Sequence, residues 1–177
     1  MAVFQKILEF FTPLQPEPEI IVSAPLAATY QIRPLTDKHL DEVLHLNRRC
    51  FKKGENYTKY TFSFLLSEPN TLSYRIASQT ENMVAFIFVT VGEDGAGHIT
   101  TVGVAPEHRR RGLARKLLAH VEEALKKRGI STICLEVRID NIPAQMLYRH
   151  FGYAIVQKLP KYYNNGEDGF LMVKSLS

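Results

Sequence analysis

The chain has 177 residues and lacks any long apolar run. Its longest unbroken apolar stretch, residues 83–89, has seven residues, whereas a membrane-spanning helix needs about 20. Apolar residues make up 45% and charged residues 23% of the sequence, which is ordinary for a globular domain. These values exclude a disordered or collagen-like chain, they predict no transmembrane segment, and the length favours one domain.

Cysteine is scarce, with Cys50 and Cys134 as its two copies. Neither a Cys-x-x-Cys nor a His-Glu-x-x-His pattern occurs, so we predict no disulfide framework and no protein-bound metal. The apolar stretch at the N-terminus is interrupted by Lys6 and Glu9 and broken by Pro13, unlike a secretion signal. We therefore expect a cytoplasmic protein with reduced thiols.

No strong excess of one charge is present, because 22 basic and 18 acidic residues leave a net charge of +4. The basic residues gather, however, and five of the nine residues in 108–116 are Arg or Lys. This cluster fits an anionic ligand. A nucleic-acid-binding module without catalysis is an alternative, although no aromatic residues that stack on bases are interleaved with the arginines.

The pattern of the sequence changes near residue 30. In 1–29, apolar residues at helical spacing precede four prolines, which predicts an N-terminal arm with a short amphipathic helix. Residues 30–177 predict a mixed α/β domain. The expected strands are 30–34, 71–78, 83–91, 98–104, 131–137, 153–159 and 169–174, and the expected helices are 36–50, 60–66, 112–128 and 141–150.

The passage 102–115 carries the clearest chemical signal. An apolar strand runs into a basic turn, and Gly112 then opens a long helix. The free N–H groups and positive dipole end of a helix N-terminus bind phosphate, and a small residue such as Gly112 or Ala114 lets an anion approach the backbone. Neither Gly-x-Gly-x-x-Gly nor Gly-Lys-Ser/Thr is present, so a dinucleotide fingerprint and a P-loop do not fit.

The spacing Arg109-x-x-Gly112-x-Ala114 resembles the acetyl-CoA pyrophosphate motif of the GCN5-related N-acetyltransferase (GNAT) superfamily. Within it, the segments 135–141, 147–148 and 151–153 resemble the protein N-terminal acetyltransferase branch, which includes RimI-like and NatA catalytic-subunit-like proteins. The passages 55–57, 97–100 and 161–168 resemble the NatA catalytic subunit more narrowly. Lys53-Gly54 differs from the Leu-Pro that those relatives usually have before the first of these passages. The resemblance implies a mostly antiparallel mixed sheet flanked by helices, with a cleft for acetyl-CoA between the fourth and fifth strands.

The resemblance also implies roles for single residues. Glu136 would be the general base, and an α-amino group with a pKa of about 7.7–8.0 needs only a modest one. Glu136 also ends an otherwise apolar strand, where a carboxylate fits best if it faces a cleft or pairs with Arg138. Tyr148 would donate a proton to the CoA sulfur, and His98 would hold a water near Glu136. The structural alternatives are a core aromatic for Tyr148 and an ordinary surface or core histidine for His98.

Cofactor contacts would come from the basic turn, from the backbone before it and from the following helix. The expected residues are Val102, Gly103, Val104, Arg109, Arg110, Arg111, Gly112, Leu113, Ala114, Arg115, Asn141 and Tyr148. Asn141 fits a helix cap equally well.

Glu55, Tyr57, Tyr162 and Tyr163 would line the peptide entrance, with loop or hairpin packing as their structural alternative. The expected reaction is direct transfer of acetyl from acetyl-CoA to a protein N-terminus with a small first residue such as Ala or Ser. The substrate would be a ribosomal protein or a nascent chain, and the need for an auxiliary subunit stays open. A lysine side chain or a small-molecule amine is the alternative acceptor.

Overall fold

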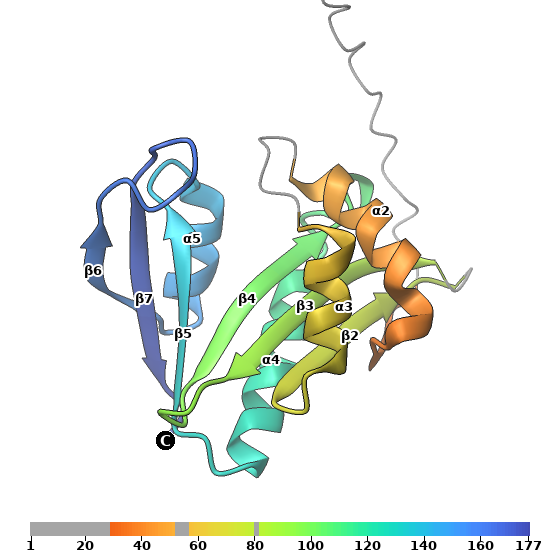
Figure 1. The fold of residues 1–177 in the computed structure, drawn as a ribbon, viewed down its shortest axis with the longest axis horizontal. Coiled ribbons are helices and arrows are strands. Elements are labelled where there is room, and N and C mark those ends of the chain that lie inside the picture. Colours follow the sequence, from red (N-terminus) through yellow and green to blue (C-terminus); the bar gives the residue numbers. More distant parts are fainter. Residues whose placement is uncertain (1–28, 52–56, 80–81) are drawn as a thin grey trace, which may run out of the picture.

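The computed structural model describes residues 29–51, 57–79 and 82–177. These residues form a seven-stranded sheet in the order β1-β2-β3-β4-β5-β7-β6 (Figure 1). Neighbouring strands run antiparallel except β4 and β5, which run parallel. The strands are β1 Gln31–Pro34, β2 Thr71–Ala77, β3 Met83–Val91, β4 Gly97–Val104, β5 Thr132–Arg138, β6 Ala154–Leu159 and β7 Gly169–Ser175.

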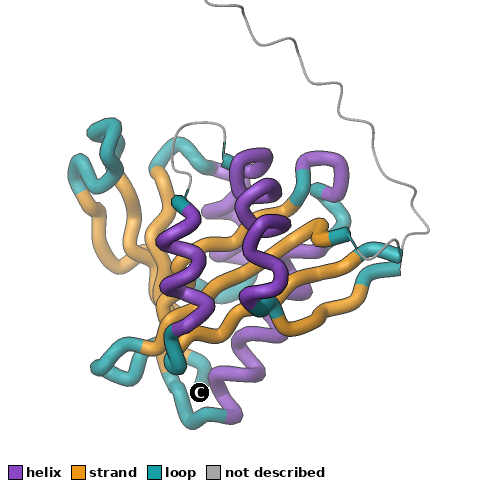
Figure 2. The backbone as a smooth tube through the Cα atoms, turned by 45° about the vertical axis from the view of Figure 1, so that its right-hand side comes forward, coloured by secondary structure: helices purple, strands orange, loops and turns teal. Residues whose placement is uncertain are grey.

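Helices cover both faces of the sheet. The α-helices are α2 Leu40–Cys50, α3 Lys59–Ser67, α4 Leu113–Lys127 and α5 Ile142–His150, and two short 3₁₀ turns, η2 and η3, span Asp37–His39 and Pro106–His108. Helices α2 and α3 lie together on one face, and α4 crosses the other face behind β2, β3 and β4 (Figure 2). Helix α5 lies behind β5 on the same side as α4 (Figure 1).

Helix α4 shows how the sequence builds these layers. Its buried apolar residues recur at helical spacing and face the sheet, namely Leu113, Leu117, Leu118, Val121 and Leu125. The helix ends at Lys127, and Gly129 just beyond it adopts a φ of +75° that disfavours other residues. On the opposite face, the rings of Phe62, Phe86 and Phe88 pack against one another with centroids 5.3–6.2 Å apart. Together these contacts close the core around β3.

The predicted mixed sheet with flanking helices is confirmed, and the element boundaries agree to within two residues almost throughout. The helix predicted from Thr36 differs at its start, because 37–39 form a 3₁₀ turn. The His39 Nδ1 atom accepts a hydrogen bond from the Thr36 N–H group, which tightens this turn. The predicted N-terminal helix and the 80–81 part of the β2–β3 turn lie outside the described residues.

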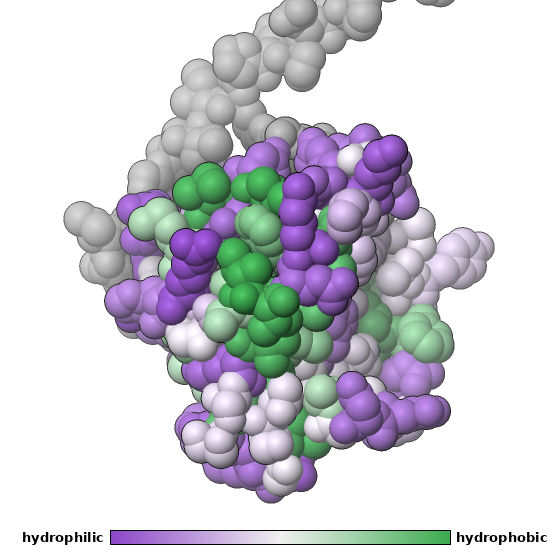
Figure 3. All heavy atoms as spheres, turned by 90° about the vertical axis from the view of Figure 1, so that its left-hand side faces the viewer, coloured by the Kyte–Doolittle hydropathy of each residue, from purple (hydrophilic) through white to green (hydrophobic). Residues whose placement is uncertain are grey.

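Strand β6 forms one edge of the sheet. Seen from that side, the surface carries a patch of apolar side chains bordered by polar ones (Figure 3).

In the described ranges 29–51, 57–79 and 82–177, no helix has both the length and the apolar character needed to cross a membrane.

Candidate active site

Strands β4 and β5 separate along their length and open a cleft in the sheet. They pair in parallel at two positions, Gly97 with Ile133 and His98 with Cys134, whereas β5 pairs with β7 at seven positions. Beyond His98 the two strands diverge (Figure 1). The β3–β4 register also shifts near Thr100, and the Tyr57 hydroxyl donates a hydrogen bond of 3.0 Å to the Thr100 carbonyl. The sheet therefore opens between the fourth and fifth strands, where the cofactor cleft is predicted.

At the open end of β4, a cavity of about 490 Å³ lies beside the start of α4. It is lined by Val104, His108, Arg109, Arg110, Gly112, Leu113, Ala114, Arg115, Pro143, Ala144 and Leu147. Gly112 precedes the helix with a φ of +74° and provides no side-chain cap. The first hydrogen bond inside the helix runs from the Lys116 N–H group to the Gly112 carbonyl. The N–H groups of the first turn therefore remain available to an anion.

The arginines of the basic turn make different contacts. Arg109 donates hydrogen bonds to the carbonyls of Val104 and Cys50, so it fixes the turn against β4 and α2. Arg111 reaches the Tyr30 hydroxyl at 3.4 Å and Arg115 contacts the His150 ring at 3.2 Å. Arg110 has a φ of +61°, which is uncommon for a residue with a side chain and helps form the curved turn. The turn thus combines cations with a fixed backbone.

His108 is the imidazole in the wall of this cavity. Its Nδ1 atom lies 3.0 Å from the Tyr30 hydroxyl, and the two rings meet edge to face. Burial lowers the pKa of His108, and the nearby Glu107 carboxylate offsets only part of that effect. The ring is therefore mainly neutral at pH 7.

These features fit acetyl-CoA, whose pyrophosphate is a bulky anion and whose pantetheine arm is extended. Free N–H groups and the guanidinium groups of Arg110 and Arg115 would hold the phosphates. A methyl group built on Gly112 would meet no atom within 4 Å, so the space above the turn is open to a ligand. Among the described residues, no group of three or more metal-ligating side chains is present.

The second wall of the cavity comes from α5. The Asn141 side chain accepts a hydrogen bond from the Ala144 N–H group at 3.2 Å and so caps this helix. Tyr148 lies almost fully buried, with its ring edge to face against Tyr153. Burial raises the pKa of Tyr148 to about 12, so its hydroxyl keeps its proton at physiological pH.

Glu136 and His98 meet across the opening between the two strands. The Nε2 atom of His98 lies 2.6 Å from a carboxylate oxygen of Glu136, and both side chains are partly exposed to the cleft. The sequence alternative, an ion pair of Glu136 with Arg138, is not what the structure shows, because Arg138 pairs with Glu167. A histidine bound to a carboxylate at a cleft is an arrangement that can accept and pass on a proton.

The segment between β6 and β7 carries Tyr162 and Tyr163, next to the end of β5. Burial, together with the charge and hydrogen bonding of Glu136, raises the pKa of Tyr162. The Tyr162 and Tyr163 rings meet edge to face with centroids 5.1 Å apart. Of the other residues expected at the peptide entrance, Tyr57 lies beside the Thr100 bulge, and Glu55 is outside the described residues.

Several residues of the site are not predicted by the sequence patterns. Pro143, Ala144 and Leu147 line the cavity from one face of α5, and their spacing from the Asn141 cap was the available signal. Arg138 carried the same signal as Glu136, since both are charged residues near the end of an apolar strand. Five residues expected at the cofactor do not line this cavity, namely Val102, Gly103, Arg111, Asn141 and Tyr148. A side chain on Gly103 would collide with Phe86, so packing alone accounts for this glycine.

Known proteins share this architecture and about a third of the aligned residues. The family model "Acetyltransferase (GNAT) family" matches residues 40–153. An N-alpha-acetyltransferase of Sulfolobus acidocaldarius is 30% identical over 171 residues, which cover 89% of this chain and 99% of that protein. N-alpha-acetyltransferase daf-31 of Caenorhabditis elegans is 35% identical over 130 residues, 70% of this chain and 71% of that one. The structure of the ribosomal-protein-S18-alanine N-acetyltransferase from Escherichia coli superposes with a TM-score of 0.76 at 28% identity, covering 84% of this chain and 95% of that one.

The fold and the cavity therefore define an acetyltransferase that uses acetyl-CoA. The chain belongs to the GNAT family, and the two relatives from Sulfolobus acidocaldarius and Caenorhabditis elegans are N-alpha-acetyltransferases.

Proposed function

We propose that this enzyme transfers the acetyl group of acetyl-CoA to the free α-amino group of a protein N-terminus. The observation that carries the proposal is the contact of His98 with Glu136, next to the point where β4 and β5 begin to separate. The relative from Sulfolobus acidocaldarius, an N-alpha-acetyltransferase, aligns over nearly its whole length, which supports the same type of acceptor.

The acceptor amine must lose its proton before it can attack. A free α-amino group has a pKa of about 7.7–8.0, and a lysine side chain has one of about 10.4, so the α-amino group is easier to deprotonate at pH 7. Glu136 is the general base of the proposal, acting directly or through a water, and His98 orients its carboxylate. Since an α-amino group needs only a modest base, this pair is sufficient.

Bound acetyl-CoA supplies the activated acetyl thioester. The turn 109–115 would hold its pyrophosphate, and the backbone of β4 near Val102, Gly103 and Val104 would face its pantetheine arm. Tyr148 is the proposed proton donor on the leaving-group side, because its raised pKa keeps the hydroxyl protonated. The proposed base lies on β5 and the proposed acid on α5, the next element along the chain.

The peptide would enter between Tyr57 and the Tyr162–Tyr163 pair. A free N-terminus brings one chain segment to this entrance, whereas an internal lysine must bring two, which the tyrosines would obstruct. The first residue of the substrate is therefore expected to be small, such as Ala or Ser. Both described cysteines are free thiols, which agrees with a cytoplasmic substrate such as a nascent chain or a ribosomal protein.

The test uses acetyl-CoA and peptides that carry one internal lysine, with the α-amino group either free or blocked. We expect mass spectrometry to locate the acetyl group on the free α-amino group, and to find little product with the blocked peptide. Peptides that differ in their first residue then rank the preference. Equal acetylation of the blocked form contradicts the proposal and favours a lysine acceptor, and transfer to small amines alone contradicts it as well.

A further inference from the structure

We propose that Arg138 is a positioning residue for the peptide side of the active site. Its guanidinium group holds residues 161–168, between β6 and β7, in the conformation that places the Tyr162–Tyr163 pair beside the end of β5. The inference rests on the proposed function, since it assumes that this segment borders the acceptor. It assigns to Arg138 a role that acts through Tyr163 and Tyr162 rather than on the reacting atoms.

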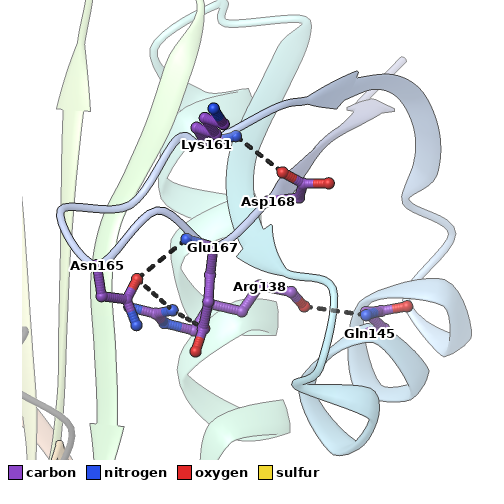
Figure 4. Close-up of polar contacts among 6 residues, drawn as sticks. All are labelled: Arg138, Gln145, Lys161, Asn165, Glu167 and Asp168. Carbon is purple, nitrogen blue, oxygen red and sulfur yellow. Dashed lines mark hydrogen bonds and ion pairs between the residues drawn. The ribbon is translucent and has the colours of Figure 1, made fainter.

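Arg138 ends β5 and is a buried charged residue, with 9% of its surface exposed. A buried guanidinium group must find acceptors for its N–H groups. Arg138 finds them in the 161–168 segment, where it pairs with Glu167 and donates a hydrogen bond of 3.3 Å to the side-chain oxygen of Asn165 (Figure 4). Its guanidinium carbon also lies 4.0 Å from the centre of the Tyr163 ring. One side chain thus contacts three residues of the segment.

The segment closes on itself around these contacts. The Tyr163 N–H group donates to the Glu167 carbonyl at 3.1 Å, and the Gly166 N–H group donates to the Tyr163 carbonyl at 2.7 Å. At the start of the segment, Lys161 has a φ of +50° and its N–H group donates to Asp168 (Figure 4). A residue with a side chain keeps such a φ only where surrounding contacts enforce it. The conformation therefore depends on its anchors, and Arg138 is the buried one.

The backbone of Arg138 is itself held by a side chain of α5. The side-chain amide of Gln145, on α5, donates hydrogen bonds to the carbonyls of Arg138 and Ile139 at 3.0 and 2.8 Å. Because Gln145 is buried, these bonds are shielded from water. The anchor that holds the segment is thus tied to the helix that forms one wall of the cofactor cavity.

A chain of contacts leads from Arg138 back to the base. Glu136 and Arg138 lie two positions apart on the same face of β5, about 7 Å along the strand. Tyr163 stacks on Arg138, and Tyr162 meets Tyr163 edge to face. The pKa of Tyr162 is raised by burial and by the charge of Glu136, which agrees with a phenol on the Glu136 side of the pair. Loss of the guanidinium group removes the support of Tyr163 first and of Tyr162 through it, while the cofactor turn, on α4, is untouched.

The test compares Arg138→Met, Arg138→Lys and Lys158→Met with the unchanged protein. Methionine keeps an unbranched apolar stem but no charge, and lysine keeps the charge without the planar fork. Lys158→Met is the matched control, because it removes the exposed 2.8 Å ion pair with Asp168 in the same part of the chain. For each variant, KM for the peptide, kcat, the acetyl-CoA dissociation constant and the thermal midpoint are measured.

We expect Arg138→Met to raise KM for the peptide about tenfold or more, the effect of losing one charge-assisted hydrogen bond. The acetyl-CoA dissociation constant should stay within about twofold, Arg138→Lys should fall between, and Lys158→Met should match the unchanged protein. A purely structural role predicts that acetyl-CoA affinity and peptide KM weaken together. The inference is overturned if acetyl-CoA affinity and peptide KM weaken together in Arg138→Met, or if its peptide KM is unchanged. It is also overturned if Lys158→Met shows the same increase in peptide KM.

A fluorescence measurement separates this inference from the proposed function. The chain contains no tryptophan, so Tyr162→Trp introduces a single reporter beside Tyr163. Adding Arg138→Met should shift its emission to longer wavelength and lower its anisotropy, and adding Lys158→Met should change neither. If the unchanged enzyme acetylates no N-terminal peptide, the proposed function is wrong, and this readout still decides on Arg138. Unchanged emission and anisotropy in Arg138→Met would overturn the inference alone.

Discussion

Replacement of Gly112 tests the assignment of the cofactor site most directly. Gly112 has a φ of +74°, and a Cβ atom added there would meet no atom within 4 Å. Alanine at this position therefore causes no clash within the protein, and its cost comes from the left-handed backbone, about 1–2 kcal/mol. If the turn rearranges to relieve this strain, the free N–H groups of the first turn of α4 no longer converge on one anion.

The chain offers a matched control at the other end of the same helix. Gly129 has a φ of +75°, and its added Cβ would also meet nothing within 4 Å. Gly112→Ala and Gly129→Ala should therefore lose similar stability, about 1–2 kcal/mol or roughly 2–8 °C in thermal midpoint. They should differ in ligand binding, because Gly112 is in the cavity lining and Gly129 is at the far end of α4.

Calorimetric titration with acetyl-CoA measures the difference. We expect Gly112→Ala to weaken binding about tenfold or more, which corresponds to about 1.4 kcal/mol, and Gly112→Val to weaken it further. Gly129→Ala should bind like the unchanged protein. Equal dissociation constants for the two alanine variants would refute the assignment of the phosphate site to this turn.

Three further predictions concern the acid, the base and a buried ion pair. Glu136→Gln should lower kcat by about 10²–10⁴ in steady-state assays with little change in acetyl-CoA affinity, and full activity from pH 6 to 9 would contradict the role of Glu136 as base. Tyr148→Phe should lower kcat. Because burial raises the pKa of Tyr148 from 10 to about 12, the folded state binds this proton more tightly than the unfolded state between pH 10 and 12. In denaturant unfolding, the unchanged protein should therefore lose stability over this pH range more steeply than the variant. Lys174→Met should lower the free energy of unfolding by about 3–5 kcal/mol in the same assay, because it leaves the buried Glu122 carboxylate without its 2.5 Å partner. Adding Glu122→Leu should restore most of this stability, and an unchanged stability in Lys174→Met would show that the pair contributes nothing.

Local sequence patterns determined most of the fold. The apolar stripe of α4 with Gly129 after it, the Asn141 cap before Pro143, and the apolar run of β3 each follow from interactions within one segment, and the structure contains all three. The basic turn before Gly112 was visible for the same reason, because a phosphate-binding helix start is built from consecutive residues.

Contacts between distant segments could not be obtained in this way. His98 and Glu136 are 38 positions apart and meet only because β4 and β5 lie side by side at their start. Arg109 lines the cavity as expected, and its guanidinium group also donates to the carbonyls of Val104 and Cys50, of which Cys50 lies 59 positions away. Arg138 could equally have paired with Glu136 on its own strand, and the packing of the 161–168 segment gave it Glu167 instead. The sequence by itself determined which segments become helices, strands and an anion-binding turn, because those depend on neighbouring residues. Only the tertiary structure decided which charged groups meet, because each has several partners within reach and burial selects among them.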